Sequence, residues 1–120
     1  MDNTELGARG EDAAVAYLLR AGMEILDRNW RNGRGELDII ALDGDELVFC
    51  EVKTRRTEAR GSAEDAVSPA KQRQLTRLAR AYLAGTGLDD CPVRFDVVAI
   101  RLLSGERALL RHHRAAFLVE

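Results

Sequence analysis

Two apolar runs joined by a tight turn are the feature that most constrains the fold of this chain. They lie within residues 35–55 and are separated by Asp43-Gly44-Asp45. An Asp-Gly pair between alternating apolar residues is a strong signal for a β-hairpin. The second run begins with residues 47–50, which are apolar on both faces of a strand. Such a strand is typical of the buried centre of a sheet, so the hairpin predicts the core of the fold.

Three charged residues, Asp38, Glu51 and Lys53, lie at one end of this hairpin. Strand alternation puts Glu51 and Lys53 on one face, and it puts Asp38 on the same face as Ile40. Hairpin pairing could bring Asp38 beside Glu51, and adjacent carboxylates repel unless a proton or cation lies between them. Mg²⁺ is commonly held by one or two carboxylates with waters and phosphate oxygens. The pattern indicates either a metal site acting on phosphodiesters, with Lys53 stabilising charge, or a plain Glu51–Lys53 ion pair.

The spacing of Asp38 and Glu51-Val52-Lys53 resembles the motif of the PD-(D/E)xK nuclease superfamily, although Leu37 rather than Pro precedes Asp38. The wider sequence is similar to the YraN-like family of small bacterial predicted endonucleases. The matching segments are residues 7–11, 29–31, 35–41, 48–55, 71, 94–98 and 116–117. The resemblance implies a restriction-endonuclease-like core that cleaves DNA, including branched or damaged DNA, with Mg²⁺ or Mn²⁺. Its kinship with archaeal Holliday-junction resolvases implies a homodimer.

A helix is predicted over residues 4–22, ended by Gly22. At 100° per residue Glu11 falls on the apolar, core-facing stripe of this helix with Ala14 and Leu18. A carboxylate there either pairs with a basic side chain or serves as a further partner of a metal or lysine. The resemblance implies that Glu11 completes or orients the metal site.

Positive charge follows the carboxylates along the chain. Residues 1–52 contain 5 Lys/Arg and 12 Asp/Glu, whereas residues 53–80 contain 8 and 3. A basic patch beside a metal site suits phosphate-backbone binding, and the alternative is a set of solvated loop and helix positions. We expect backbone phosphates to be contacted by Arg34, Arg55, Arg56, Lys71 and Arg73. Lys71 could instead cover the edge of the core with its aliphatic stem. Residues 54–67 are expected to form a mobile loop at the mouth of the site.

The remaining elements complete an α/β domain over residues 1–120. Strands are predicted at 24–31, 93–102 and 107–111, and a helix begins at Ser68-Pro69. The element order αβββαββ predicts a mixed sheet flanked by helices. Trp30 is expected to anchor the core and Asp96 to be structural. The adjacent His112 and His113 are expected to point to opposite sides of a strand and to be incidental.

Composition excludes several other classes of protein. No apolar run approaches the ~20 residues that span a bilayer, and the acidic N-terminus lacks the features of a signal peptide. Cys50 and Cys91 are not in a CxxC arrangement, which favours free thiols in the cytoplasm. The leading hypothesis is a Mg²⁺-dependent endonuclease. The alternatives are a nucleic-acid-binding or protein-interaction module without hydrolytic activity, and a hydrolase of a different phosphodiester.

Overall fold

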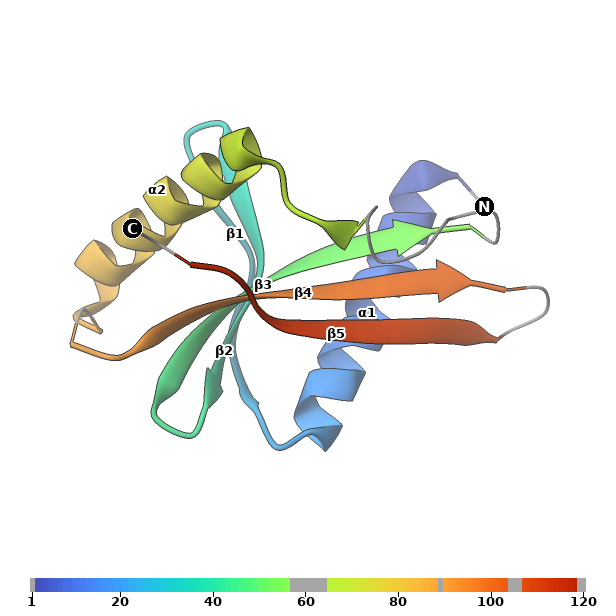
Figure 1. Ribbon diagram of the computed structural model, residues 1–120, viewed down its shortest axis with the longest axis horizontal. Coiled ribbons are helices and arrows are strands. Elements are labelled where there is room, and N and C mark those ends of the chain that lie inside the picture. The colour runs from blue at the N-terminus through green and yellow to red at the C-terminus, as the bar shows by residue number, and fades with distance from the viewer. Residues whose placement is uncertain (1, 57–64, 89, 104–106, 119–120) are drawn as a thin grey trace.

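A computed structural model describes residues 2–56, 65–88, 90–103 and 107–118 (Figure 1). The elements, in chain order, are α1 (Asn3–Arg20), β1 (Glu24–Asn32), β2 (Gly35–Asp43), β3 (Glu46–Arg55), α2 (Pro69–Thr86), β4 (Val93–Leu102) and β5 (Ala108–Phe117). This order confirms the αβββαββ prediction. The expected mobile loop falls mostly on residues 57–64, which lie outside the described residues, as does the turn at 104–106.

The five strands form one mixed sheet in the order β1-β2-β3-β4-β5. The pairs β1–β2, β2–β3 and β4–β5 are antiparallel, and β3–β4 is parallel. A parallel pair needs a crossover connection, and α2 lies within the segment that connects β3 to β4. The predicted tight turn between β2 and β3 is present, with Gly44 at φ 64°. The prediction that β3 is a central strand is confirmed.

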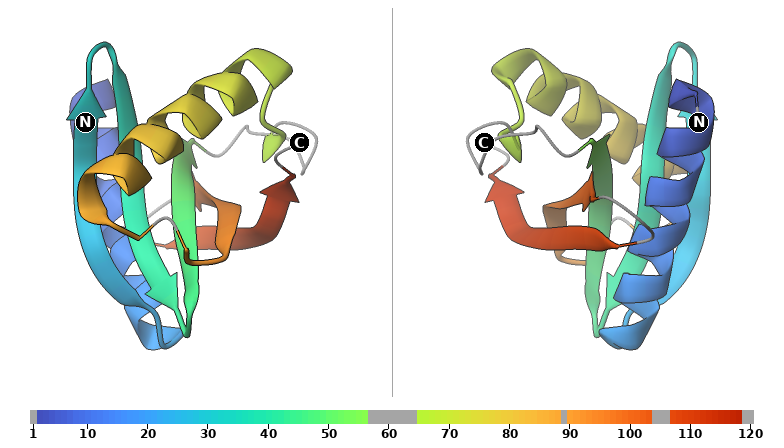
Figure 2. Two further views of the ribbon diagram at one scale, coloured as in Figure 1. Left: turned by 90° about the vertical axis from the view of Figure 1, so that its left-hand side faces the viewer. Right: turned by 90° about the vertical axis from the view of Figure 1, so that its right-hand side faces the viewer.

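The two helices cover opposite faces of the twisted sheet (Figure 2). On the α1 face, Ala14 and Leu18 pack against Ile39, Val48 and other buried strand residues. On the α2 face, the buried cluster includes Leu75, Leu78, Ala79 and Tyr82 of α2 together with side chains from β2, β3 and β4. Trp30 contacts Tyr82 edge-to-face at 5.3 Å between ring centroids, which confirms its role as a core anchor.

The helix ends follow the expected capping chemistry. Ser68 caps α2 by accepting a hydrogen bond from the Lys71 backbone N–H at 3.2 Å, and Pro69 is the first helical residue. The helix ends at Thr86, and the Gly87 that follows it is left-handed. The first helix stops at Arg20, just before Gly22 at φ 93°. Within the described residues, no helix has the length and hydrophobicity needed to cross a bilayer.

A partly buried ionic network, centred on the fully buried Asp96, joins the β2–β3 turn to β4 and β5. Arg94 bonds to both carboxylate oxygens of Asp96, at 2.8 and 3.0 Å, and to Asp43 and Glu46 at 3.1 and 2.8 Å. Asp96 also bonds to His112 Nε2 at 2.7 Å and accepts from the Ala115 N–H at 3.0 Å. The structural role predicted for Asp96 is therefore confirmed.

The last strand corrects the sequence prediction. It runs from Ala108 to Phe117 rather than over residues 107–111, because pairing with β4 continues past the histidines. His112 and His113 are not incidental: His112 bonds to Asp96, and His113 bonds to Asp65 at 3.0 Å. They do point to opposite faces, since Tyr17 of α1 also bonds to His112, at 2.9 Å.

Candidate metal and phosphate site

Asp38 and Glu51 meet where β2 and β3 begin to separate. The last two pairs of the β2–β3 ladder are Ile40 with Phe49 and Ile39 with Cys50, so the next residues along are Asp38 and Glu51. Asp38 Oδ2 accepts a hydrogen bond from the Val52 N–H at 2.8 Å. Burial raises the pKa of Asp38 to about 8, helped by a hydrogen bond to the Glu51 carboxyl group and by its negative charge. Without a cation, the pair therefore retains a proton near neutral pH.

A break in strand alternation aims Asp38 between the two faces of the sheet. Leu37 packs in the α2 cluster, whereas Ile39, two residues later, packs in the α1 cluster. The neighbouring strand changes face at the same level, because Arg28 bonds to Asp12 of α1 and Trp30 contacts Tyr82 of α2. Asn29, between them, has a φ of 53°. The regular alternation predicted for Asp38 and Ile40 is therefore wrong at this point.

The third predicted carboxylate, Glu11, approaches Asp38 from α1. Its side chain is 19% exposed and lies 3.8 Å from Arg28 Nη2. Burial, and then the negative charge of Asp38, raises the pKa of Glu11, while Asn29 and Arg28 oppose that rise. Glu11 therefore pairs with an arginine, as one interpretation of the sequence expects, and it also faces the carboxylate pair, as the other interpretation requires.

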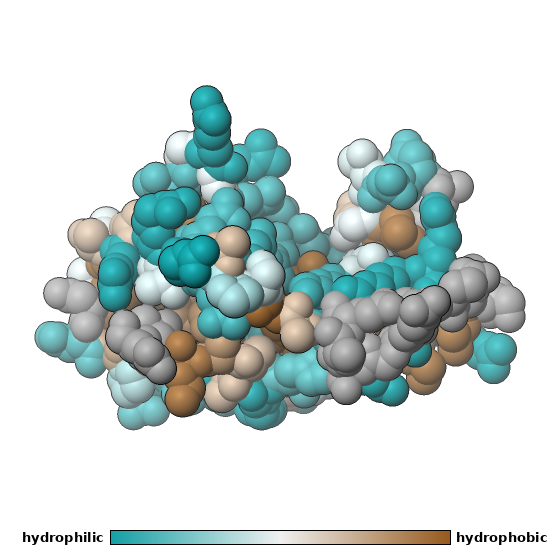
Figure 3. Space-filling model, turned by 45° about the horizontal axis from the view of Figure 1, so that its top comes forward, coloured by the Kyte–Doolittle hydropathy of each residue, from teal (hydrophilic) through white to brown (hydrophobic). Residues whose placement is uncertain are grey.

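A hollow of about 250 Å³ lies in front of Asp38 and Glu11. Its other lining residues are Asn3, Leu6, Gly7, Val52 and Thr54. The surface is hollowed between the start of α1 and the bulk of the molecule that includes α2, and the side chains there are mostly hydrophilic (Figure 3). The helix comes close to the sheet because Gly10 packs directly against Thr54, leaving no space for a Cβ atom.

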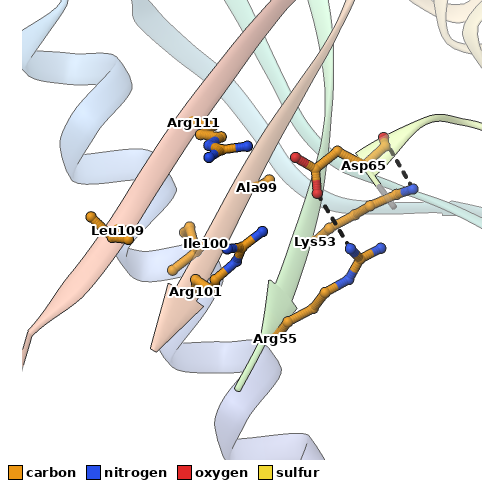
Figure 4. A pocket seen from close by; sticks show the side chains of 8 residues that line it. All are labelled: Lys53, Arg55, Asp65, Ala99, Ile100, Arg101, Leu109 and Arg111. Carbon is orange, nitrogen blue, oxygen red and sulfur yellow. Dashed lines mark hydrogen bonds and ion pairs between the residues drawn. The ribbon is translucent and has the colours of Figure 1, made fainter. Parts of the chain in front are cut away.

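Two lysines flank the carboxylates on the α2 face. Lys71 Nζ, from the first turn of α2, lies 3.3 Å from Glu51 Oε2. Lys53 Nζ donates a hydrogen bond to the backbone carbonyl of Asp65 at 3.2 Å (Figure 4) and another to that of Ala66 at 2.8 Å. Burial, and then the charge of Arg55, lowers the pKa of Lys53, while the charge of Glu51 opposes that change. The ammonium group is thus near the site and is oriented by backbone oxygens.

The other predicted phosphate contacts are dispersed. Arg55 Nη1 lies 3.4 Å from Asp65 Oδ1, and Arg56 is exposed just beyond β3. Arg34 is exposed in the β1–β2 turn. Arg73 is exposed on α2, where it lines a separate groove of about 670 Å³ with Phe117 and Leu118. Lys71 is the member of the set that the structure brings to the carboxylates.

Sequence reasoning missed Asp65, whose side chain is only 5% exposed and bonds to Arg55 and His113. It also missed Arg101 and Arg111, which line a hollow with Lys53 and Arg55. Arg111 lies within the predicted last strand, but its position near Lys53 depends on pairing with Ala99 of β4, which no local pattern shows.

The Asp38–Glu51 carboxyl pair is a suitable set of donors for a hard divalent ion. A buried carboxyl pair in hydrogen-bond contact is the arrangement that such an ion would relieve by replacing the shared proton. Within residues 2–56, 65–88, 90–103 and 107–118, no three His, Cys, Asp or Glu side chains are arranged to hold a metal ion. Asp38 and Glu51 would therefore hold the ion as a pair, with water and phosphate oxygens as the remaining ligands.

Comparison with known proteins gives consistent matches. Residues 10–100 match the model of the Uncharacterised protein family UPF0102. A UPF0102 protein of Rhodococcus jostii is 52% identical over 115 residues, covering 96% of this chain and 98% of the relative. A UPF0102 protein of Geobacter sulfurreducens is 50% identical over 115 residues, covering 96% and 90%. The matched range includes Glu11, Asp38, Glu51, Lys53 and Lys71.

Proposed function

The chain belongs to the Uncharacterised protein family UPF0102, and we propose that it is a metal-dependent endonuclease that hydrolyses phosphodiester bonds in DNA. The observation that carries the proposal is the contact between the Asp38 and Glu51 carboxyl groups, with Lys53 and Lys71 beside them. Two acidic and two basic groups at one point suit an anionic phosphodiester bound through a cation. A DNA substrate would place the activity in the cytoplasm.

Each residue has a role that follows from its surroundings. Asp38 and Glu51 would hold Mg²⁺ or Mn²⁺, and Glu11, which faces Asp38, would orient that carboxylate or a bound water. When bound, the ion supplies Lewis acidity toward a phosphodiester oxygen and a more acidic water. Lys53, held by the Asp65 and Ala66 carbonyls, would stabilise the charge that develops on the phosphate. When Glu51 binds the metal ion, Lys71 would no longer pair with Glu51 and would contact a phosphate oxygen of the substrate.

The elements around the site favour recognition of DNA shape over reading of the base sequence. Base reading in the major groove uses an inserted helix or β-ribbon, and both described helices are packed on the sheet. We therefore propose recognition of DNA shape, as in branched or damaged DNA. The resemblance to resolvases extends this proposal to a homodimer.

A direct test is cleavage of supercoiled, linear and four-way-junction DNA in Mg²⁺, Mn²⁺ or EDTA. We expect cutting that requires metal and that is lost in Glu51→Gln and Lys53→Gln. Glu24→Gln is the matched control, because Glu24 is exposed at the far end of β1. Metal-independent cutting, or equal activity of Glu51→Gln and the control, would contradict the proposal.

One observation favours a second function, a nucleic-acid-binding module without hydrolysis. Lys71 already pairs with Glu51, and Lys53 already donates to backbone carbonyls, so neither side chain needs a metal ion as a partner. Such a module would shift DNA in gels without cutting it, and Glu51→Gln would bind DNA as well as or better than the wild type.

A further inference from the structure

The part of the sheet that α2 does not cover carries a second group of basic side chains. Parallel pairing places Arg101 of β4 beside Arg55 of β3. Antiparallel pairing places Arg111 of β5 beside Ala99, which itself lies beside Lys53. Three neighbouring strands therefore each bring cations to one region, although these residues are far apart in the sequence.

All four side chains lie on the same face of the sheet. Val97 packs in the α2 cluster and Ile100 in the α1 cluster, so alternation puts Arg101 on the α2 face. In the close view, the Arg101 and Arg111 guanidinium groups extend over β4, on the side where Lys53 and Arg55 meet Asp65 (Figure 4). We call the surface formed by Lys53, Arg55, Arg101 and Arg111 the basic face.

We propose that the basic face binds the phosphate backbone of the nucleic acid that enters the Asp38–Glu51 site. The inference rests on the proposed function and names the surface that holds its substrate. Glu51 and Lys53 are two residues apart on one face, or about 7 Å along the strand. Arg111 lies two strands from Lys53, which adds about 10 Å across the sheet. The face thus leads directly away from the carboxylate pair.

The shape of the basic face favours backbone contacts over a buried ligand. The hollow at its centre measures about 20 Å³, which is room for about one water molecule and too little for a nucleobase. Its lining residues include four basic side chains and one acidic one, Asp65. Arginine guanidinium groups bind phosphate oxygens in a bidentate manner, so a face with three arginines suits successive phosphates of a strand lying across it.

Binding can be measured separately from cleavage. We would follow the fluorescence anisotropy of a labelled short duplex and a labelled four-way junction in EDTA, over a range of salt concentrations. Each of Arg101→Gln and Arg111→Gln should weaken binding roughly tenfold at about 0.1 M salt. Each should also reduce the slope of log affinity against log salt by about 1, and the double variant by about 2.

Matched variants show whether a loss of DNA affinity comes from a lost local contact, from a lost positive charge or from unfolding. Arg20→Gln removes an exposed arginine from the last turn of α1, on the opposite face, and should bind DNA as the wild type does. Arg111→Lys keeps the charge and should retain the salt slope. Thermal unfolding of each variant identifies any loss of affinity that comes from unfolding.

The experiment distinguishes failure of the basic-face proposal from failure of the nuclease proposal. If the arginine variants lose DNA binding while no protein cuts DNA in metal, the basic face stands and the nuclease proposal fails. If folded Arg101→Gln and Arg111→Gln bind like the wild type, or no more weakly than Arg20→Gln, the basic face is refuted even where cleavage occurs. Wild-type binding to phosphatidylglycerol vesicles but not to DNA would also refute it, in favour of a lipid surface.

Discussion

Lys71 and Glu51 form an ion pair between the first turn of α2 and the middle of β3, with 3.3 Å between Nζ and Oε2. The Glu51 side chain is 10% exposed and the Lys71 side chain 40% exposed, so the lysine closes the open side of the carboxylate. Because Glu51 also contacts Asp38, Lys71 partly neutralises the pair. A divalent ion at this pair and Lys71 would therefore compete for Glu51.

This competition predicts the effect of Lys71→Gln on cation binding. The variant should lose less than about 1 kcal/mol of stability without metal, because the lysine is partly exposed. Mn²⁺ should raise its melting temperature by more than it raises that of the wild type. Arg77→Gln, an exposed position on the same helix, is the control and should match the wild type. A smaller Mn²⁺ effect in Lys71→Gln would show that the lysine assists the ion rather than competing with it.

Asp38→Asn tests the carboxyl pair by its pH dependence. Folding raises the pKa of Asp38 to about 8, mainly through burial, so the folded state binds a proton more tightly than the unfolded chain. Metal-free wild-type protein should therefore lose stability as pH rises from about 4 toward 8. The asparagine can donate to Glu51 and accept from Val52, so its stability should not show this decline.

The measurement is urea unfolding in EDTA at several pH values across that range, followed by the same series with Mn²⁺. Mn²⁺ should stabilise the wild type and leave Asp38→Asn unchanged. An identical pH profile in the two proteins would mean that folding does not raise the pKa of Asp38.

Gly10→Ala tests the close packing of α1 on β3. An added Cβ would overlap the Thr54 side chain, so the helix must move away, at a cost of roughly 1–3 kcal/mol. Gly7→Ala is a matched control in the same helix, because nothing lies within 4 Å of its added Cβ. That change should stabilise the protein by about 0.5–1 kcal/mol through helix propensity.

Chemical denaturation of Gly10→Ala and Gly7→Ala shows whether close packing or helix propensity determines the stability change. Equal effects on the unfolding free energy would show that helix propensity alone matters. A selective loss in Gly10→Ala would show that the glycine is required for the approach that brings Glu11 toward Asp38.

Asp96→Asn tests the network around Arg94. Burial alone would raise the pKa of Asp96, but hydrogen bonds from Arg94, His112 and the Ala115 N–H outweigh it and lower that pKa. The wild type should keep this stability above the ordinary carboxyl pKa of about 4 and lose it as pH falls further. The variant leaves Arg94 without its main partner and should lose about 3–5 kcal/mol at neutral pH.

Urea unfolding from neutral to acidic pH measures both effects. The difference between wild type and Asp96→Asn should shrink as the pH falls. Asp45→Asn, at an exposed turn position, should follow the wild type throughout. A difference that stays constant with pH would mean that the charge of Asp96 is not what stabilises the network.

Much of the fold could be predicted because its signals are local. The Asp-Gly turn, the doubly apolar β3 and the Ser68-Pro69 helix start depend on a few neighbouring residues, and each was found in place. The end of β5 could not be predicted in this way. It depends on pairing with β4 through residues such as Val97 and His113, which periodicity alone does not reveal.

In the candidate site, too, only the features with local signals could be predicted. Asp38, Glu51 and Lys53 were identified by spacing and resemblance, but the route by which Asp38 reaches Glu51 was not. That route depends on the break in alternation beside Asn29, whose φ is 53°. The partners of Lys53 and Glu51, the Asp65 and Ala66 carbonyls and Lys71, come from segments 12 to 20 residues later in the chain.

The amino-acid sequence alone therefore determined the order of the elements and the chemical types gathered at the end of the central hairpin, because turns, caps and alternation act over short distances. Only the tertiary structure decided which charges became neighbours. Lys71 reached Glu51, and Arg101 and Arg111 joined Lys53 and Arg55, because helix packing and strand register bring together residues that no local pattern connects.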